Sequence, residues 1–319
     1  MGMLNKRAMR LVRELMEDPD YFNVQVIGLS NGATIIDMGS GVQGSWRAAE
    51  YFTRITLGDL CSFGYGTWPH DKTTTFASVQ LAVERPLIAC LASQIAGWQL
   101  GEGEFATIGS GPARAVAAVE GDPYMEMTPY RESADEVVLC VQDSRPPTPE
   151  MAAAVAGSCG VGPEDVYLLL APAACLVGSV QVSARILEQV CHKMFENGFD
   201  VAKVTNCRGS APVAPIVKDE VKAMGRINDA LLYGSETEFW VDAADGEIKE
   251  IVGKLTSLDS SPQYGTPFEE IFEAAGCDFF HIDHQVHSIG RIRMHNVRTG
   301  TSFAAGEYHH ELIGRSFLS

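Results

Sequence analysis

The chain has 319 residues, of which 46% are hydrophobic and 20% are charged, and its formal net charge is −17. This composition is typical of a globular protein with enough residues for one large or two medium domains. So acidic a chain repels phosphate backbones, which argues against broad nucleic-acid binding. It favours cationic ligands, and anionic ligands only where basic residues gather locally.

The cysteines and the N-terminus indicate the compartment. Eight cysteines are scattered along the chain without a Cys-x-x-Cys motif, as expected for buried thiols in a reducing environment. The N-terminus is charged and lacks the apolar core of a signal peptide, and no apolar run is long enough to cross a membrane. We therefore expect a soluble cytoplasmic protein.

The first half of the chain is predicted to mix helices, hairpins and short strands. Apolar residues at helical spacing predict a helix over residues 4–17, which stops before Pro19. Residues 24–27 and 34–37 are expected to be strands around an Asn31-Gly32 turn. The other elements expected here are a glycine-rich loop at 37–44, strands at 76–84, 86–92 and 105–108, and a helix that opens at 109–115 with Pro112 in its first turn.

Strands and helices alternate most clearly in the second half. The expected strands are at 136–142, 166–170, 201–205 and 238–241, followed by a hairpin at 291–303. The expected helices are at 148–156, 179–197, 216–224 and 266–276; Thr148 would cap the first and a capping box with Pro267 would open the last. Hairpins at both ends of the chain favour an α+β (mixed α/β) fold with two lobes over a doubly wound sheet.

Arg185 and Glu188 are the leading catalytic candidates. Residues three apart share a helix face, so the guanidinium and the carboxylate would point into the same space. Beside a cleft such a pair could activate water, whereas on the surface it would be an ion pair worth about 0–1 kcal/mol. The helix's apolar stripe lies on the opposite face and consists of Val182, Ile186, Val190 and Met194.

A second candidate is the predicted strand–loop–helix junction Gly109-Ser110-Gly111-Pro112. Free backbone N–H groups at such a junction can bind an anion or a polar ligand edge, and Arg114 would add a positive charge. The segment lacks the lysine and the spacing of a P-loop, so a tight structural turn explains it equally well. Ser179, which follows Gly178 at the start of the predicted helix, is a further candidate contact.

Two other groups of residues have binding chemistry. Lys218, Lys222 and Arg226 recur every four residues with Arg208 upstream, and such a basic stripe could bind an anionic ligand tail or be solvated and paired with its acidic neighbours. His281, Asp283, His284 and His287 include metal-binding side chains. A strand at 279–282 would point His284 and His287 in opposite directions, which argues against a metal site.

Common enzyme signatures are missing. The sequence contains no Gly-x-Ser-x-Gly nucleophile elbow, and no Gly-x-Gly-x-x-Gly follows a predicted strand. These absences argue against a serine hydrolase of that type and against a Rossmann dehydrogenase.

Several segments, in order along most of the chain, resemble the methenyltetrahydromethanopterin cyclohydrolase family. The matching segments are Ala89-Cys-Leu-x-Ser-Gln-x-Ala-Gly-Trp-Gln99, Gly109-Ser-Gly-Pro-Ala-Arg-Ala115, Ala171-Pro172, Val177-Gly-Ser-Val-Gln181, Ser183-x-Arg-Ile-x-Glu188 and Lys222-Ala-Met-Gly-x-x-Asn-Asp229. Where the family often has glycine between the serine and the arginine, this chain has Ala184, a small change that a helix accepts.

The resemblance implies a fold, an assembly and a reaction. Residues 1–319 would form one family unit of two interleaved α/β-type lobes, side by side with a deep pocket between them, and we expect chain crossovers near 85–95 and 205–215. The protein would be a cytoplasmic homotrimer without metal or organic cofactor. It would reversibly hydrolyse the methenyl bridge of 5,10-methenyltetrahydromethanopterin to the 5-formyl product.

The resemblance makes Arg185 and Glu188 the catalytic pair, and the chemistry of the residues suggests the individual roles. Glu188 would be the general base for water, and Arg185 would orient it and hold its pKa down, while burial would raise that pKa. Gly109, Ser110, Gly111, Arg114 and Ser179 would contact the pterin. Lys218 and Lys222 would bind an anionic tail.

Two alternatives belong to other classes. A metal-dependent amidohydrolase would use the 281–287 region and lose activity with a chelator. A pterin-binding protein without catalysis would bind the ligand and leave its absorbance unchanged.

Overall fold

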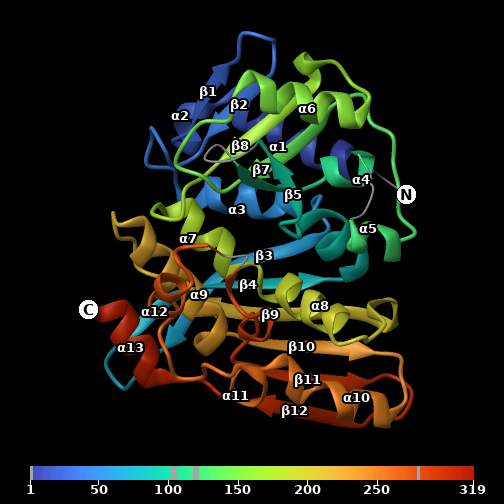
Figure 1. The fold of residues 1–319 in the computed structure, drawn as a ribbon, viewed down its shortest axis with the longest axis vertical. Helices are drawn as coiled ribbons and strands as arrows, with labels where there is room; N and C mark the ends of the chain where they lie inside the picture. Colours follow the sequence, from blue (N-terminus) through green and yellow to red (C-terminus); the bar gives the residue numbers. More distant parts are fainter. Residues whose placement is uncertain (1–2, 102–105, 118–121, 279–280) are drawn as a thin grey trace. The chain divides into compact units, whose positions relative to one another are not determined.

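The computed structural model describes residues 3–101, 106–117, 122–278 and 281–319. The chain divides into two compact units: unit 1 comprises residues 1–61 and 88–181, and unit 2 comprises residues 62–87 and 182–319. Each unit contains a mixed six-stranded sheet with helices (Figure 1), which confirms the predicted α+β class. Residues 205–215, where we expected a crossover, lie inside unit 2.

The sheet of unit 1 has the strand order β1-β2-β8-β7-β6-β5. The three central strands β2, β8 and β7 are parallel, and the outer strands join them antiparallel. Parallel strands of this kind are apolar on both faces because helices cover both faces. The strands are β1 Gln25–Gly28, β2 Thr34–Asp37, β5 Trp98–Leu100, β6 Thr107–Ser110, β7 Val137–Val141 and β8 Val166–Leu170.

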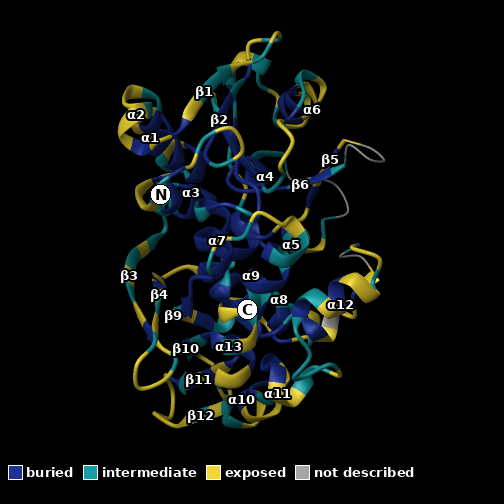
Figure 2. Ribbon diagram, turned by 90° about the vertical axis from the view of Figure 1, so that its left-hand side faces the viewer, coloured by how far each residue is buried: buried dark blue, intermediate teal, exposed yellow. Residues whose placement is uncertain are grey.

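Helices cover both faces of this sheet. Figure 2 shows α1 and α3 on one side of β1 and β2, and α6 on the other. The core between the sheet and α6 includes Val137, Leu139, Leu168 and Val155, all fully buried. The helices of this part of the chain, the last of which runs from unit 1 into unit 2, are α1 Leu4–Glu17, α2 Pro19–Phe22, α3 Trp46–Thr56, α4 Ala113–Ala117, α5 Pro123–Met127, α6 Pro149–Cys159 and α7 Leu176–Ser183.

The sheet of unit 2 has the order β12-β11-β10-β9-β4-β3; β10 and β11 are parallel, and the β9–β10, β11–β12 and β4–β9 pairs are antiparallel. Figure 2 shows α8, α9 and α13 on the same side of these strands. Burial alternates along β10: Thr237, Phe239 and Val241 are buried, and the residues between them are half-exposed. The strands are β3 Cys61–Pro69, β4 Thr75–Val83, β9 Val204–Pro212, β10 Glu236–Val241, β11 Arg291–Asn296 and β12 Ser302–Gly306.

The remaining helices belong to unit 2, and two of them begin differently from the prediction. Helix α9 begins at Glu220 behind the cap Asp219, so residues 216–218 precede it. At α12 the expected capping box is absent: Pro267 is the N-cap, and the Phe268 N–H donates to Asp229 Oδ1 at 2.8 Å. These helices are α8 Ile186–Glu196, α9 Glu220–Gly234, α10 Asp245–Ile251, α11 Ser257–Ser260, α12 Phe268–Ala274 and α13 His310–Leu318.

Several predicted elements are confirmed. Helix α1 has the predicted bounds, and β1 and β2 form the expected antiparallel hairpin. Thr148 caps α6 as predicted, because its side chain accepts the Met151 N–H, but the helix continues past Gly157 to Cys159, and Gly160 is its C-cap. A Cβ at Gly157 would meet nothing within 4 Å, whereas Gly160 has the positive φ that ends a helix.

Other predictions were wrong. The expected strand at 86–92 is a π-helix, Leu87–Gln94, and the expected strand at 201–205 starts as a 3-10 turn, Val201–Lys203, before β9. Helices α3 and α13 and strand β3 were not predicted. Phe105, in the expected strand at 105–108, and Phe279 and Phe280, in that at 279–282, lie outside the described residues; His281 and Ile282 are not in a strand.

No helix within the described ranges is both long and apolar enough to cross a membrane. No disulfide joins any of the eight cysteines in the part of the chain that the structure describes.

Candidate active site

Arg185 lies at a break between two helices. The single helix expected over 179–197 is divided: α7 ends at Ser183 and α8 begins at Ile186. Arg185 is the N-cap of α8, with φ −85° and ψ 3°, and its N–H donates to Val182 O at 2.8 Å. This tight i−3 bond replaces an α-helical bond and closes a 3-10-type turn at the break.

The Arg185–Glu188 pair forms at the start of α8 and is buried. Arg185 Nη1 lies 3.3 Å from Glu188 Oε2, and the two side chains are only 13% and 7% exposed. The alternative of a solvated surface pair is therefore wrong. Glu188 is the third residue of α8, where the helix dipole stabilises a negative charge.

The apolar face of α8 fixes the direction of this pair. Ile186, Val190 and Met194 are fully buried, as the predicted stripe requires, and α8 packs on β9 and β10. A Cβ at Gly209 of β9 would lie 2.8 Å from Ile186 Cδ1 and 3.0 Å from Glu236 O. Glycine at this position lets the first turn of α8 approach the sheet closely.

Lys193, further along α8, was missed by the sequence analysis. It is 2% exposed, and its Nζ donates to Gln285 O at 2.9 Å, which ties the 3-10 turn His284–Val286 to the helix. Burial lowers the pKa of Lys193 to about 8, against the opposing effects of Asp283 and Glu196. In the sequence, the burial of Lys193 was indicated only by its position among the apolar residues Val190, Cys191 and Met194.

In unit 1, packing explains the glycines of the second candidate. Gly109 and Ser110 belong to β6, and Gly111 follows with φ 120°. A Cβ at Gly109 would lie 2.6 Å from Leu139 Cδ2. The Gly111 N–H donates to Ser93 O at 2.7 Å, so this amide is bound to the π-helix.

Arg114 and Ser179 are buried in unit 1. The Arg114 guanidinium pairs with Asp122 and donates to Leu91 O at 3.0 Å. Asp122 also caps α5, so the ion pair links two helices. Ser179 lies in the first turn of α7 and is 2% exposed. A Cβ at its neighbour Gly178 would come within 1.9 Å of Pro172 O, so only glycine fits there.

The basic stripe is not a feature of one helix. Lys218 is exposed and lies before α9. Lys222 Nζ and Arg226 Nη2 bind Ser319 O, at 3.4 and 2.6 Å, and Arg226 Nη1 also binds Pro215 O at 3.3 Å. Two of the three cations therefore have partners within the chain.

Comparison with known proteins decides the family. Residues 3–317 match the model of the family described as Cyclohydrolase (MCH). The chain belongs to this family. The methenyltetrahydromethanopterin cyclohydrolase of Methanocaldococcus jannaschii is 40% identical over 315 residues, which are 98% of this chain and 97% of that protein. The enzyme of the same name from Methanothermobacter marburgensis is 38% identical over 321 residues, 99% of each chain.

The described part of the histidine region does not gather metal ligands. Among the described residues, no group of three or more His, Cys, Asp or Glu side chains could hold a metal ion. His281 is 70% exposed and lies 3.7 Å from Asp278, and the side chain of His284 is not described. The described residues therefore do not support the metal-dependent alternative.

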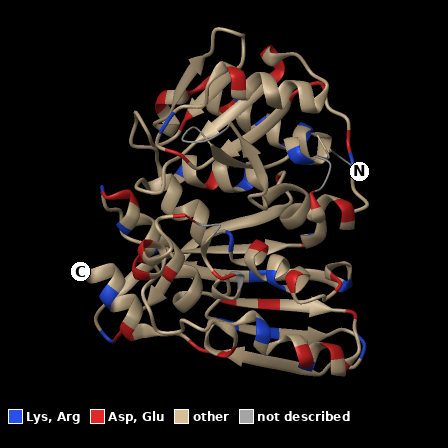
Figure 3. Cartoon of the chain, viewed as in Figure 1, with Lys and Arg blue, Asp and Glu red and all other residues tan. Residues whose placement is uncertain are grey.

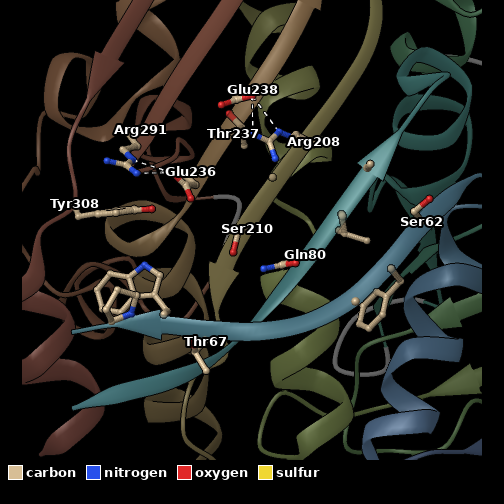
Figure 4. A pocket seen from close by; sticks show the side chains of 17 residues that line it. Ser62, Thr67, Gln80, Arg208, Ser210, Glu236, Thr237, Glu238, Arg291 and Tyr308 are labelled. Carbon is tan, nitrogen blue, oxygen red and sulfur yellow. Dashed lines mark hydrogen bonds and ion pairs between the residues drawn. The ribbon is translucent and has the colours of Figure 1, made fainter. Parts of the chain in front are cut away.

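The cyclohydrolase also has a cavity of about 680 Å³ on the sheet of unit 2. Figure 4 shows paired charges there: Arg208 lies 3.0 Å from Glu238, and Arg291 pairs with Glu236 and stacks 4.0 Å over the ring of Tyr308. The hydrogen bond from Arg208 lowers the pKa of Glu238. Arg208, grouped above with the basic stripe, is therefore paired with a carboxylate in this cavity. Acidic residues occur in both units of the chain (Figure 3).

Proposed function

We propose that this cyclohydrolase reversibly hydrolyses the methenyl bridge of 5,10-methenyltetrahydromethanopterin to 5-formyltetrahydromethanopterin. The observation that carries the proposal is the buried Arg185–Glu188 pair in a chain whose relatives are named for this substrate. The methenyl carbon bridges two nitrogens as a cation and is already electrophilic. The missing component is a base for water.

In the proposed mechanism Glu188 takes a proton from water as the oxygen attacks the methenyl carbon. The product is a neutral tetrahedral carbinolamine. Its C–N bond to one nitrogen breaks as that nitrogen gains a proton and the carbinol hydroxyl loses one, which leaves the formyl group on the other nitrogen, and the proton taken by Glu188 is released to solvent. A positioned carboxylate contributes about 10²–10⁴-fold to such a step. Arg185, 3.3 Å away, orients the carboxylate and keeps it ionised.

We further propose two groups of substrate contacts. Ser110 and Ser179 supply hydroxyls, and Gly109, Gly111 and Arg114 shape the segment around Ser110. Lys218, which is exposed, is the proposed contact for an anionic tail, and Lys222 lies one helical turn into α9.

On the basis of the family resemblance, we also propose that the protein is cytoplasmic, forms a homotrimer and needs neither a metal nor an organic cofactor. Light scattering of the purified protein tests the assembly: a mass three times 34.5 kDa is expected, and a monomer would contradict it.

The experiment that tests the reaction follows ultraviolet absorbance while the protein is incubated with methenyltetrahydromethanopterin or with methenyltetrahydrofolate, each with and without a chelator. We expect rapid loss of absorbance with the first substrate, independent of the chelator. Loss of activity with the chelator would favour the amidohydrolase alternative. Binding without a change in absorbance would favour a non-catalytic pterin-binding protein.

A further inference from the structure

A buried serine connects the helix break to the sheet of unit 2. Ser183 is the last residue of α7, two residues before Arg185, and it is fully buried. Its Oγ donates to Pro212 O at 2.8 Å, across 29 residues of sequence. We propose that Ser183 is a positioning residue, which fixes the break between α7 and α8 so that Glu188 and Arg185 meet. This inference rests on the proposed function of the pair.

The target of the bond distinguishes Ser183 from an ordinary helical serine. A serine inside a helix usually donates to a carbonyl three or four residues earlier, which leaves the helix independent of its surroundings. Ser183 donates instead to the last residue of β9. The end of α7 is therefore attached to a strand at the position where the chain must change direction.

The receiving carbonyl is held firmly. Pro212 pairs with Ser78 of β4, and the next residue, Val213, donates its N–H to Ala77 O at 2.8 Å. On its other side Pro212 packs against α9, where a Cβ at Gly234 would lie 2.6 Å from Pro212 Cγ. The Ser183 hydrogen bond therefore anchors the helix break to the Pro212 carbonyl, which is held in place by both the sheet and α9.

A small shift at this break would alter the catalytic pair. The 3.3 Å between Arg185 Nη1 and Glu188 Oε2 is already long for a charge-assisted hydrogen bond. Without the Ser183 hydroxyl, the turn at residues 184–185 loses its hydrogen bond to β9. A misplacement of about 1 Å in a catalytic group can cost about 10²-fold in rate.

Ser257 provides a matched control. Its side chain is buried in the same unit and, like that of Ser183, its Oγ donates to a distant carbonyl, Leu232 O, at 2.7 Å; the Oγ also lies 2.9 Å from Ser288 Oγ and 3.2 Å from Ile289 O. Replacing it with alanine removes a comparable bond far along the chain from residues 183–188. A merely structural role of Ser183 predicts similar behaviour of Ser183→Ala and Ser257→Ala.

The first experiment measures kcat, KM and the unfolding midpoint for the full-length variants with methenyltetrahydromethanopterin. We expect Ser183→Ala to lower kcat by roughly 10–100-fold while KM changes by less than about twofold. Ser183→Thr, which keeps a hydroxyl, should restore most of kcat. Ser257→Ala should lower the midpoint and leave kcat unchanged. Unchanged kcat in Ser183→Ala, or an equal loss in Ser257→Ala, would overturn the inference.

A double-mutant cycle tests whether Ser183 acts through Glu188. If it does, Ser183→Ala should lower the rate of Glu188→Gln by less than about twofold, because the group that it positions is already missing. Multiplicative losses would show an independent role and contradict the inference. The cycle also separates the two claims: a near-wild-type rate in Glu188→Gln defeats the proposed function, whereas a defective Glu188→Gln beside a normal Ser183→Ala defeats only this inference.

Discussion

Unit 2 contains two kinds of arginine–carboxylate pair with similar contact distances and different surroundings. Arg185 and Glu188 are 3.3 Å apart and 13% and 7% exposed, at the start of a helix. Arg208 and Glu238 are 3.0 Å apart and 63% and 27% exposed, on neighbouring strands. The shorter pair is the one in contact with water. Distance alone therefore does not identify the pair that can act on a substrate.

The surroundings change what each pair can do. Water screens the exposed pair, which is worth about 0–1 kcal/mol and loses little when one partner is removed. In the buried pair, removing one partner leaves an uncompensated charge, which is costly. In the proposed mechanism, the buried carboxylate acts on one water molecule at the substrate. The four predictions below test this contrast.

The largest expected effect is that of Glu188→Gln. The substitution keeps the shape and removes the base, so kcat should fall by about 10²–10⁴-fold. Glu238→Gln is the matched control on the exposed pair, and its kcat should match that of the wild type. Steady-state hydration assays of both variants measure this difference. Equal losses of activity in the two variants would contradict the prediction.

Arg185→Ala should have a smaller effect on rate and a distinct effect on pH dependence. Removing the cation makes the carboxylate a stronger base, so the acid limb of the kcat profile should move to higher pH. The corresponding control is Arg208→Ala. A profile with an unchanged shape would mean that Arg185 serves only binding or stability.

Asp229 offers a third environment, a buried carboxylate that accepts a backbone N–H. Burial raises its pKa from 3.8 to about 7. The folded protein therefore holds this proton more tightly than the unfolded chain does. The resulting stability is fully present below about pH 4 and is lost as the pH rises through about 7.

Asp229→Asn keeps an acceptor for the Phe268 N–H and removes the titration. Chemical unfolding at pH 5 and pH 8 should show a loss of stability on the order of a few kcal/mol in the wild type and a smaller loss in the variant. An equal loss in both would show that other groups set this pH dependence.

The smallest effects are expected on the open sheet face. Arg208→Ala should change the free energy of unfolding by less than about 1 kcal/mol, and salt should reduce the change further. Urea unfolding at low and high ionic strength measures it. A loss of several kcal/mol would mean that this face is not solvated in the assembled protein.

Local signals explain what the sequence predicted well. The apolar period of residues 4–17, the Asn31-Gly32 turn and the Thr148 cap each act over a few residues, and each appears where expected. The Ser-x-Arg-x-x-Glu spacing likewise identified the pair that the structure brings together.

The errors concern partners that are distant in the sequence. Neither Ala184 nor Arg185 is a helix breaker, so nothing local indicated the division into α7 and α8; the partner of Ser183 is Pro212. The apolar residues at 87–92 form a continuous run, and such a run shows no periodicity that would distinguish a strand from a helix. Similarly, the start of α12 depends on a hydrogen bond to Asp229, and Arg226 of the basic stripe has a partner in Ser319.

The most direct test of Glu188 as the general base is the pH profile of kcat for methenyltetrahydromethanopterin hydration in the wild type and in Glu188→Gln. We expect the wild-type rate to fall at low pH as the carboxylate is protonated, and the residual rate of the variant to lack that acid limb. The same acid limb in both proteins would contradict the assignment, and another group would have to be the base.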